Sequence, residues 1–210
     1  MRIAILCFVF LICGIALSSP VRSTLGGARN KDGIREPPYD SKVEYVYVDD
    51  GGFFLTPIKH SSSVSGRIKA KVAFQLTAIL GKYNSGIGVY VTGYVTLRYN
   101  NVSVQSSSPY QDVVLDISFS NSGLSVNGDT QAISANSFSS QDFITIGQTP
   151  DNAVLHASTY YYEIDLADAN TTMHIVPVRL KDGTGGLYDE VSGELLERSS
   201  GGTFTCGPDL

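Results

Sequence analysis

Apolar and polar residues alternate with period two along most of this chain from Val43 onward. Strict alternation predicts half-buried β-strands with one face on a core. The clearest run covers residues 67–80, whose apolar face is Ile68, Ala70, Val72, Phe74, Leu76, Ala78 and Leu80. A second run covers residues 87–99, whose apolar face is Ile87, Val89, Val91, Val95, Leu97 and Tyr99. Because turn residues separate the two runs, we expect them to pair as a central antiparallel hairpin, with Gly93 marking a bulge or bend in the second.

Shorter alternating runs follow, with turn-forming residues between them. They cover residues 113–119, 124–126, 143–146, 153–166 and 172–180, and a last short hairpin surrounds residues 189–193. No convincing apolar stripe has the helical period of 3.6 residues. We therefore expect an all-β domain of about ten antiparallel strands, a β-sandwich or jelly roll, with a β-barrel as the runner-up.

The N-terminal residues form a separate segment. An apolar run over residues 3–17 follows Arg2 and ends in Ala16-Leu17-Ser18, which has the small-x-small pattern of a signal-peptide cleavage site. The run is shorter than the ~20 residues that a membrane span needs. The sequence therefore predicts a signal peptide over 1–18, a flexible leader rich in Ser, Gly and Pro over 19–42, and one all-β domain over 43–210. We expect a secreted, extracellular protein without a membrane span.

Charge and cysteine content narrow the possible partners. The chain has 15 Lys and Arg against 20 Asp and Glu, a net charge of −5 spread along the sequence, which argues against nucleic-acid or anionic-membrane partners. Signal cleavage removes Cys7 and Cys13 and leaves Cys206 alone. A lone thiol in an oxidising compartment predicts a disulfide with an extracellular protein or a second copy. The competing interpretation is a buried cysteine in the final strand.

Two tripeptides match the acceptor pattern for N-glycosylation. They are Asn101-Val102-Ser103 and Asn170-Thr171-Thr172, and neither has proline in the middle. Each falls at a predicted strand junction or hairpin loop, where an oligosaccharyltransferase can reach the asparagine. We expect glycans on Asn101 and Asn170.

No residue pattern predicts a metal ion, a cofactor or a catalytic group. If Leu166 lies opposite Thr172 across the hairpin, Ile164 faces His174 and His156 lies far from it, so the histidines lack the spacing of a zinc site. No Gly-x-Ser-x-Gly elbow is present. Carboxylates gather weakly at positions 49–50, at 165 with 168, and at 182, and we interpret them as solvated turns.

Tyrosine is the main compositional excess, with 12 residues. Tyr160-Tyr161-Tyr162 places rings on both faces of one strand, and Tyr90 and Tyr94 are predicted to share an outer face. Tyrosine suits packing on a pleated sheet, and an exposed group of rings suits self-association or a ligand.

These residues resemble no known family. We expect a secreted extracellular glycoprotein, a non-catalytic structural or interaction component of a matrix, coat or secretion, linked to a partner through Cys206. The alternative is a carbohydrate- or calcium-binding β-sandwich module. A secreted hydrolase that uses carboxylates is the third possibility, and the absence of tryptophan, a common sugar platform, disfavours it.

Overall fold

The computed structural model describes residues 36–49, 51–74, 76–82, 86–147, 158–199 and 201–210. The predicted signal peptide, the leader up to residue 35 and His156 lie outside these residues. Every named element in the described part is a β-strand. No helix there has the length and apolar character needed to cross a bilayer.

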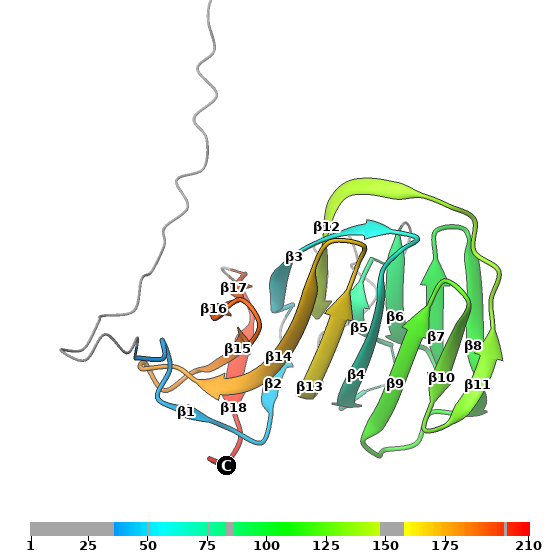
Figure 1. The fold of residues 1–210 in the computed structure, drawn as a ribbon. Coiled ribbons are helices and arrows are strands. Elements are labelled where there is room, and N and C mark those ends of the chain that lie inside the picture. The colour runs from blue at the N-terminus through cyan, green and yellow to red at the C-terminus, as the bar shows by residue number, and fades with distance from the viewer. Residues whose placement is uncertain (1–35, 50, 75, 83–85, 148–157, 200) are drawn as a thin grey trace, which may run out of the picture. The chain divides into compact units, whose positions relative to one another are not determined.

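The strands form two antiparallel sheets, which pack face to face as a sandwich and do not close into a barrel (Figure 1). In the described part, the large sheet has eleven strands: β1 (Ser41–Lys42), β2 (Val46–Asp49), β4 (Ser65–Val72), β9 (Leu115–Ser120), β10 (Gly123–Val126), β11 (Asp129–Ala132), β13 (Thr159–Ala167), β14 (Thr172–Arg179), β15 (Gly185–Asp189), β16 (Glu194–Leu195) and β18 (Thr203–Cys206). The small sheet there has seven: β3 (Phe53–Ser61), β5 (Thr77–Gly81), β6 (Ile87–Val91), β7 (Tyr94–Tyr99), β8 (Val102–Pro109), β12 (Ser139–Gly147) and β17 (Glu197–Arg198). The predicted antiparallel sandwich is confirmed.

The strand order brings together segments that are distant in sequence. The large sheet runs β11-β10-β9-β4-β13-β14-β15-β16, with β2 beside β13 and β18 beside β2. The small sheet runs β17-β3-β12-β5-β6-β7-β8. The edge strands β8 and β11 meet where Asp129 Oδ2 accepts hydrogen bonds from Ser107 N at 3.0 Å and Ser107 Oγ at 2.5 Å. This contact partly covers two edges that would otherwise offer unpaired backbone groups to other chains.

The predicted strand over 67–80 is wrong as a single element. Its first part is β4 in the large sheet and its last part is β5 in the small sheet, so the chain changes sheets between Val72 and Thr77. Phe74 and Leu76, which alternation placed on the core face, have exposed fractions of 62% and 46%. Leu76 also has a φ of 74°, a left-handed conformation that ends the extended backbone. A change of sheet at such a bend preserves the period of two, which is why the pattern did not reveal it.

The second predicted run also divides, at Gly93. This glycine has a φ of 91° and turns the chain back on itself, so that β6 and β7 pair with Val91 opposite Val95. Of the predicted central hairpin, only the pairing of β5 with β6 is present. All six residues of the predicted apolar face of this run are buried nevertheless. The predicted turns between β9 and β10, between β13 and β14 and between β15 and β16 are confirmed.

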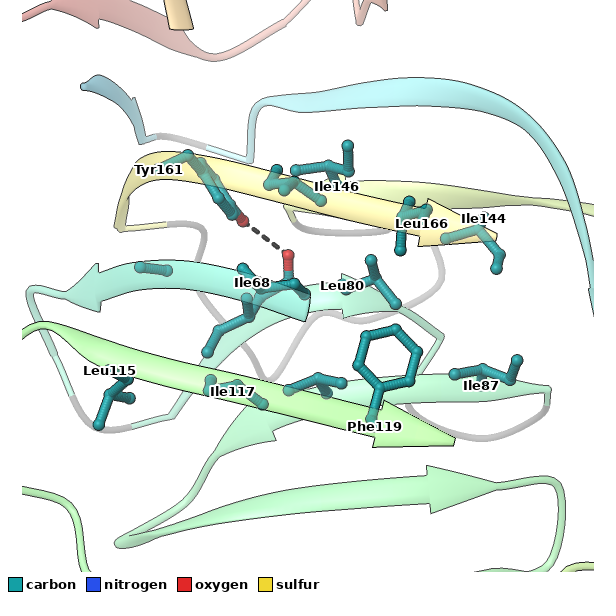
Figure 2. Close-up of a cluster of buried hydrophobic side chains, with 14 of the residues drawn as sticks. Ile68, Leu80, Ile87, Leu115, Ile117, Phe119, Ile144, Ile146, Tyr161 and Leu166 are labelled. Carbon is teal, nitrogen blue, oxygen red and sulfur yellow. Dashed lines mark hydrogen bonds between the residues drawn. The ribbon is translucent and has the colours of Figure 1, made fainter. Parts of the chain in front are cut away.

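The core fills the space between the sheets with the inward side chains of both (Figure 2). The buried Tyr161 links one sheet to the other. The Tyr161 hydroxyl, on β13, donates a 2.7 Å hydrogen bond to the carbonyl of Ile79 on β5. Ile79 is the extra residue of a bulge, because Ala78 pairs with Tyr90 and Leu80 pairs with Val89. Tyr99, on β7, donates to the carbonyl of Val64 in the turn between β3 and β4.

Candidate functional site

The two predicted glycosylation sites lie on exposed turns. Asn101 follows Asn100 in the two-residue turn that joins β7 to β8. Asn170 lies in the turn between β13 and β14, where its N–H donates to Asp168 Oδ1 at 2.8 Å. Both turns are at the same end of the sandwich, the upper end in Figure 1. Each asparagine is therefore accessible to a modifying enzyme.

Cys206 belongs to an ordered edge strand. It pairs with Val46, and the backbone pairing continues beyond it, because the N–H of Gly207 donates to the Tyr45 carbonyl at 2.8 Å. The Cys206 side chain is half-buried against the core, and its Sγ lies 3.5 Å from the carbonyl oxygen of Gly183. The sulfur thus has neither the full exposure of a mobile tail nor the full burial of a core residue.

Four tyrosines gather on the outer face of the large sheet. We call Tyr45, Tyr47, Tyr160 and Tyr162 the tyrosine patch. Strand β2 lies beside β13, and this pairing places Tyr47 directly opposite Tyr160. The ring centroids of Tyr47 and Tyr160 are 4.5 Å apart, those of Tyr45 and Tyr160 are 5.2 Å apart, and those of Tyr45 and Tyr162 are 5.8 Å apart. All four are half-buried, so each ring presents part of its surface to solvent.

Charged groups of both signs surround the tyrosine patch. Burial raises the pKa of Tyr162, and the Glu44 carboxylate raises it further while the Lys71 ammonium lowers it, so both charges act on this ring. Lys71 Nζ lies 3.1 Å from Asp112 Oδ1. The pKa of Tyr47 is raised by burial and by its hydrogen bond to Asp49 Oδ2, at 2.9 Å.

The other predicted tyrosine pair, Tyr90 and Tyr94, does not form an exposed patch of rings. Tyr90 is 7% exposed and packs against Ala78, whereas Tyr94 is 39% exposed. The two rings lie on the same outer face as predicted, because Tyr90 pairs with Thr96, two residues from Tyr94, but the turn at Gly93 puts them on two strands and not on one.

A cavity of about 220 Å³ opens at the same end of the sandwich as the Asn101 turn; we call it the loop-end cavity. Its lining includes His60, Lys82, Asn100, Phe138, Ser140 and Asp142. Lys82 Nζ donates to Asp142 Oδ2 at 2.9 Å. The Phe138 ring is half-buried and packs edge-on against Tyr99, with centroids 6.2 Å apart. Charged, amide, hydroxyl and aromatic groups thus converge on one small volume.

His60 is the buried group of the loop-end cavity, with no exposed surface. Its Nδ1 accepts a 3.0 Å hydrogen bond from the backbone N–H of Ile87, so the neutral ring carries its proton on Nε2. Nε2 is buried and meets no acceptor at good hydrogen-bond geometry, while the backbone carbonyl of Phe143 interacts with the ring. A Cβ on Gly86 would lie 2.8 Å from the ring, so glycine is needed for this close approach.

Burial lowers the pKa of His60 from its ordinary 6.5 to about 4. The neighbouring Lys82 ammonium lowers it further, while the Asp142 carboxylate and the Phe143 backbone carbonyl act in the opposite direction. The ring is therefore neutral at physiological pH.

A second cavity, of about 280 Å³, lies where β7 and β8 approach β9 to β11. Its lining is mainly apolar and uncharged, for example Val95, Val126 and Ser106. Its carboxylate, Asp129, is already engaged by Ser107. This cavity therefore presents fewer charged groups to a ligand than the loop-end cavity does.

The hairpin register brings His174 to an acidic cluster that the sequence analysis missed. The predicted register, with His174 opposite Ile164, is wrong by one residue. Ile175 lies opposite Ile164, and His174 lies opposite Asp165. His174 Nδ1 lies 2.7 Å from Asp165 Oδ1, and Nε2 lies 3.6 Å from Glu190 Oε2. The hydrogen bond with Asp165 raises the pKa of His174. Glu163, Asp165 and His174 offer ligand atoms within 4.8 Å of one another and could hold a cation.

The other carboxylates singled out from the sequence bond within their own surroundings. Asp49 Oδ1 accepts from Ser158 Oγ at 2.6 Å. Asp168 Oδ1 accepts from the N–H groups of the following turn, and Asp182 Oδ1 accepts from Thr184 N at 2.9 Å. Asp50 lies outside the described residues. Each described carboxylate thus has a local structural role.

The burial of His60 was not predicted from the sequence, although a signal was present. Phe54, Thr56, Ile58 and His60 alternate along β3, and all four point inward. A histidine in phase with apolar positions predicts a buried imidazole.

No family model, curated protein or solved structure matches this chain. The sites described here are therefore assigned from their geometry.

Proposed function

We propose that this chain is a secreted, glycosylated interaction component that associates with a second copy of itself through the tyrosine patch. The observation that carries the proposal is the cluster of four partly exposed rings on one sheet face. Tyrosine is enriched in protein interfaces, because its ring offers a large contact area and few torsions are lost on binding.

The charges beside the patch support a second copy as the occupant. A two-fold interface presents the same surface to itself, so it is favourable when opposite charges stand on opposite sides of the axis. Glu44 and Lys71 come from strand regions on either side of β13, and both act on Tyr162. A two-fold axis that runs through the patch parallel to β13 would bring Glu44 of one copy toward Lys71 of the other.

The test is sedimentation of the secreted chain over a range of concentrations under reducing conditions. We expect a reversible dimer, and we expect Tyr160→Thr with Tyr162→Thr to weaken it about tenfold or more, because interface tyrosines are common hot spots. Threonine retains a side chain suited to a strand. The control is Tyr94→Thr, an exposed tyrosine of the small sheet. A wild-type chain that stays monomeric throughout, or equal weakening by the control, would refute the proposal.

Cys206 supplies a separate, covalent prediction. Its half-buried sulfur on an edge strand is open enough to react in the secretory pathway, so we expect a disulfide to a partner or a second copy. Non-reducing electrophoresis of the secreted protein should show a band above monomer mass, which reductant or Cys206→Ser removes. A band at monomer mass, with alkylation of Cys206 only after denaturation, would contradict the disulfide and leave the tyrosine patch to be judged by sedimentation.

A further inference from the structure

The loop-end cavity offers paired rather than net charge. Lys82 Nζ and Asp142 Oδ2 are 2.9 Å apart. The carboxylate would therefore repel a bound anion, and the ammonium would repel a bound cation. Asn100 and Ser140 add groups that both donate and accept hydrogen bonds. This lining favours a neutral ligand whose own polar groups also donate and accept, which is the property of hydroxyl groups.

Two further features set the shape of that ligand. The half-buried ring of Phe138 supplies one apolar wall, against which the C–H face of a sugar ring can lie. The volume of about 220 Å³ is below the ~300–1,000 Å³ of sites for drug-sized ligands, so the cavity has room for one ring and not for a longer chain.

His60 forms a closed wall of the cavity. Its imidazole has no exposed surface and interacts with the backbone groups of Ile87 and Phe143. The hydrogen-bonding groups that a ligand can reach are therefore those of Lys82, Asn100, Ser140 and Asp142.

We propose that the loop-end cavity binds a single neutral sugar residue. This site lies apart from the tyrosine patch, so it does not depend on the proposed self-association. The sugar could be part of an external glycan or of the chain's own glycan, because Asn100 lines the cavity and Asn101 follows it.

The test is an NMR titration of the secreted chain with glucose, galactose, mannose and N-acetylglucosamine, and with sulfate as an anion probe. We expect at least one sugar, and not sulfate, to shift the amide signals of Asn100 and residues 139–142. Asp142→Asn should weaken that sugar about tenfold, because it removes a charged hydrogen-bond acceptor. The matched control is Asp112→Asn, which breaks an exposed ion pair with Lys71 away from the cavity.

The chain's own glycan is tested with Asn101→Gln. If binding of added sugar appears only in this variant, the glycan of Asn101 occupies the cavity, and if wild type and variant bind equally, the ligand is external. The proposal fails if neither protein binds any of the four sugars, if sulfate alone shifts these signals, or if Asp142→Asn and Asp112→Asn weaken binding to the same extent.

Discussion

Replacement of Tyr161 is expected to destabilise this protein more than any surface change discussed above. Tyr161→Ala should lower the free energy of unfolding by about 3–5 kcal/mol, because it empties a core site occupied by a large aromatic side chain. Tyr161→Phe keeps the ring and removes only the hydroxyl. It should cost about 1–3 kcal/mol, because it leaves the carbonyl of Ile79 buried without that donor.

The Ile79 carbonyl makes this hydroxyl important. Ile79 is the extra residue of a bulge in β5, and a bulged residue is left out of the regular ladder. The hydrogen bond from β13 therefore satisfies a group in the opposite sheet and ties the two sheets together (Figure 2).

Urea unfolding followed by circular dichroism measures both effects. The matched control is Tyr160→Phe, which removes a hydroxyl from the adjacent, outward-facing residue of the same strand and should change stability by less than about 0.5 kcal/mol. If Tyr161→Phe and Tyr160→Phe are equally stable, the link between the sheets contributes nothing measurable.

The alternating pattern predicted which residues are buried better than it predicted which strands are neighbours. The six apolar residues of the run over 87–99 are all buried, although the run is two strands. Period two is the same in either sheet, so it cannot show that the chain crosses from β4 to β5. Phe74 and Leu76 lie in that crossing, and their exposure follows from the bend and not from their hydrophobicity.

The hairpin at Asp168 shows a second limit of the pattern. Asp168 Oδ1 accepts from the N–H groups of Asn170 and Thr171, and this side-chain turn ends with Ala167 opposite Thr172. A register that differs by one residue changes every cross-strand pair. The contact between Asp165 and His174 could therefore not be derived from apolar periodicity.

Half of the tyrosine patch, Tyr160 and Tyr162, could be predicted from the sequence. The run of three tyrosines implied rings on the outer face of one strand, but Tyr45 and Tyr47 reach it only through the pairing of β2 with β13. That pairing joins residues more than a hundred positions apart. Local sequence carries no information on such a contact, because nothing in the turn chemistry specifies it.

Acidification should destabilise the protein between pH 6.5 and pH 4, mainly through His60. The pKa of this ring is about 4 in the folded protein and has its ordinary value of 6.5 in the unfolded chain. The unfolded chain therefore binds a proton more readily. The stabilisation is complete above pH 6.5 and is lost as the pH falls toward 4, by up to about 3 kcal/mol.

The structure gives this loss a local cause. A protonated ring carries hydrogen on both nitrogens, so Nδ1 can no longer accept from the N–H of Ile87. The charge would also be buried beside Lys82, with Asp142 as the opposing group. Asp116, which is paired with Arg67, and Asp142, which is paired with Lys82, have pKa values lowered from 3.8 by these hydrogen bonds, so both carboxylates stay ionised through most of this range.

The His60 assignment can be separated from the effect of His174. The pKa of His174 is raised in the folded protein, so this ring adds a smaller stabilisation that is present below pH 6.5 and is lost as the pH rises through its folded pKa. This stabilisation at low pH opposes the effect of His60. His174→Gln should therefore make the protein lose stability more steeply on acidification. His60→Asn keeps an acceptor for Ile87 and cannot titrate. Although less stable overall, it should show a flatter dependence on pH in urea unfolding, and NMR titration of the wild type should give the His60 ring a pKa well below 6.5. A ring that titrates at its ordinary value, or an unchanged slope in His60→Asn, would show that the buried imidazole does not control stability in this range.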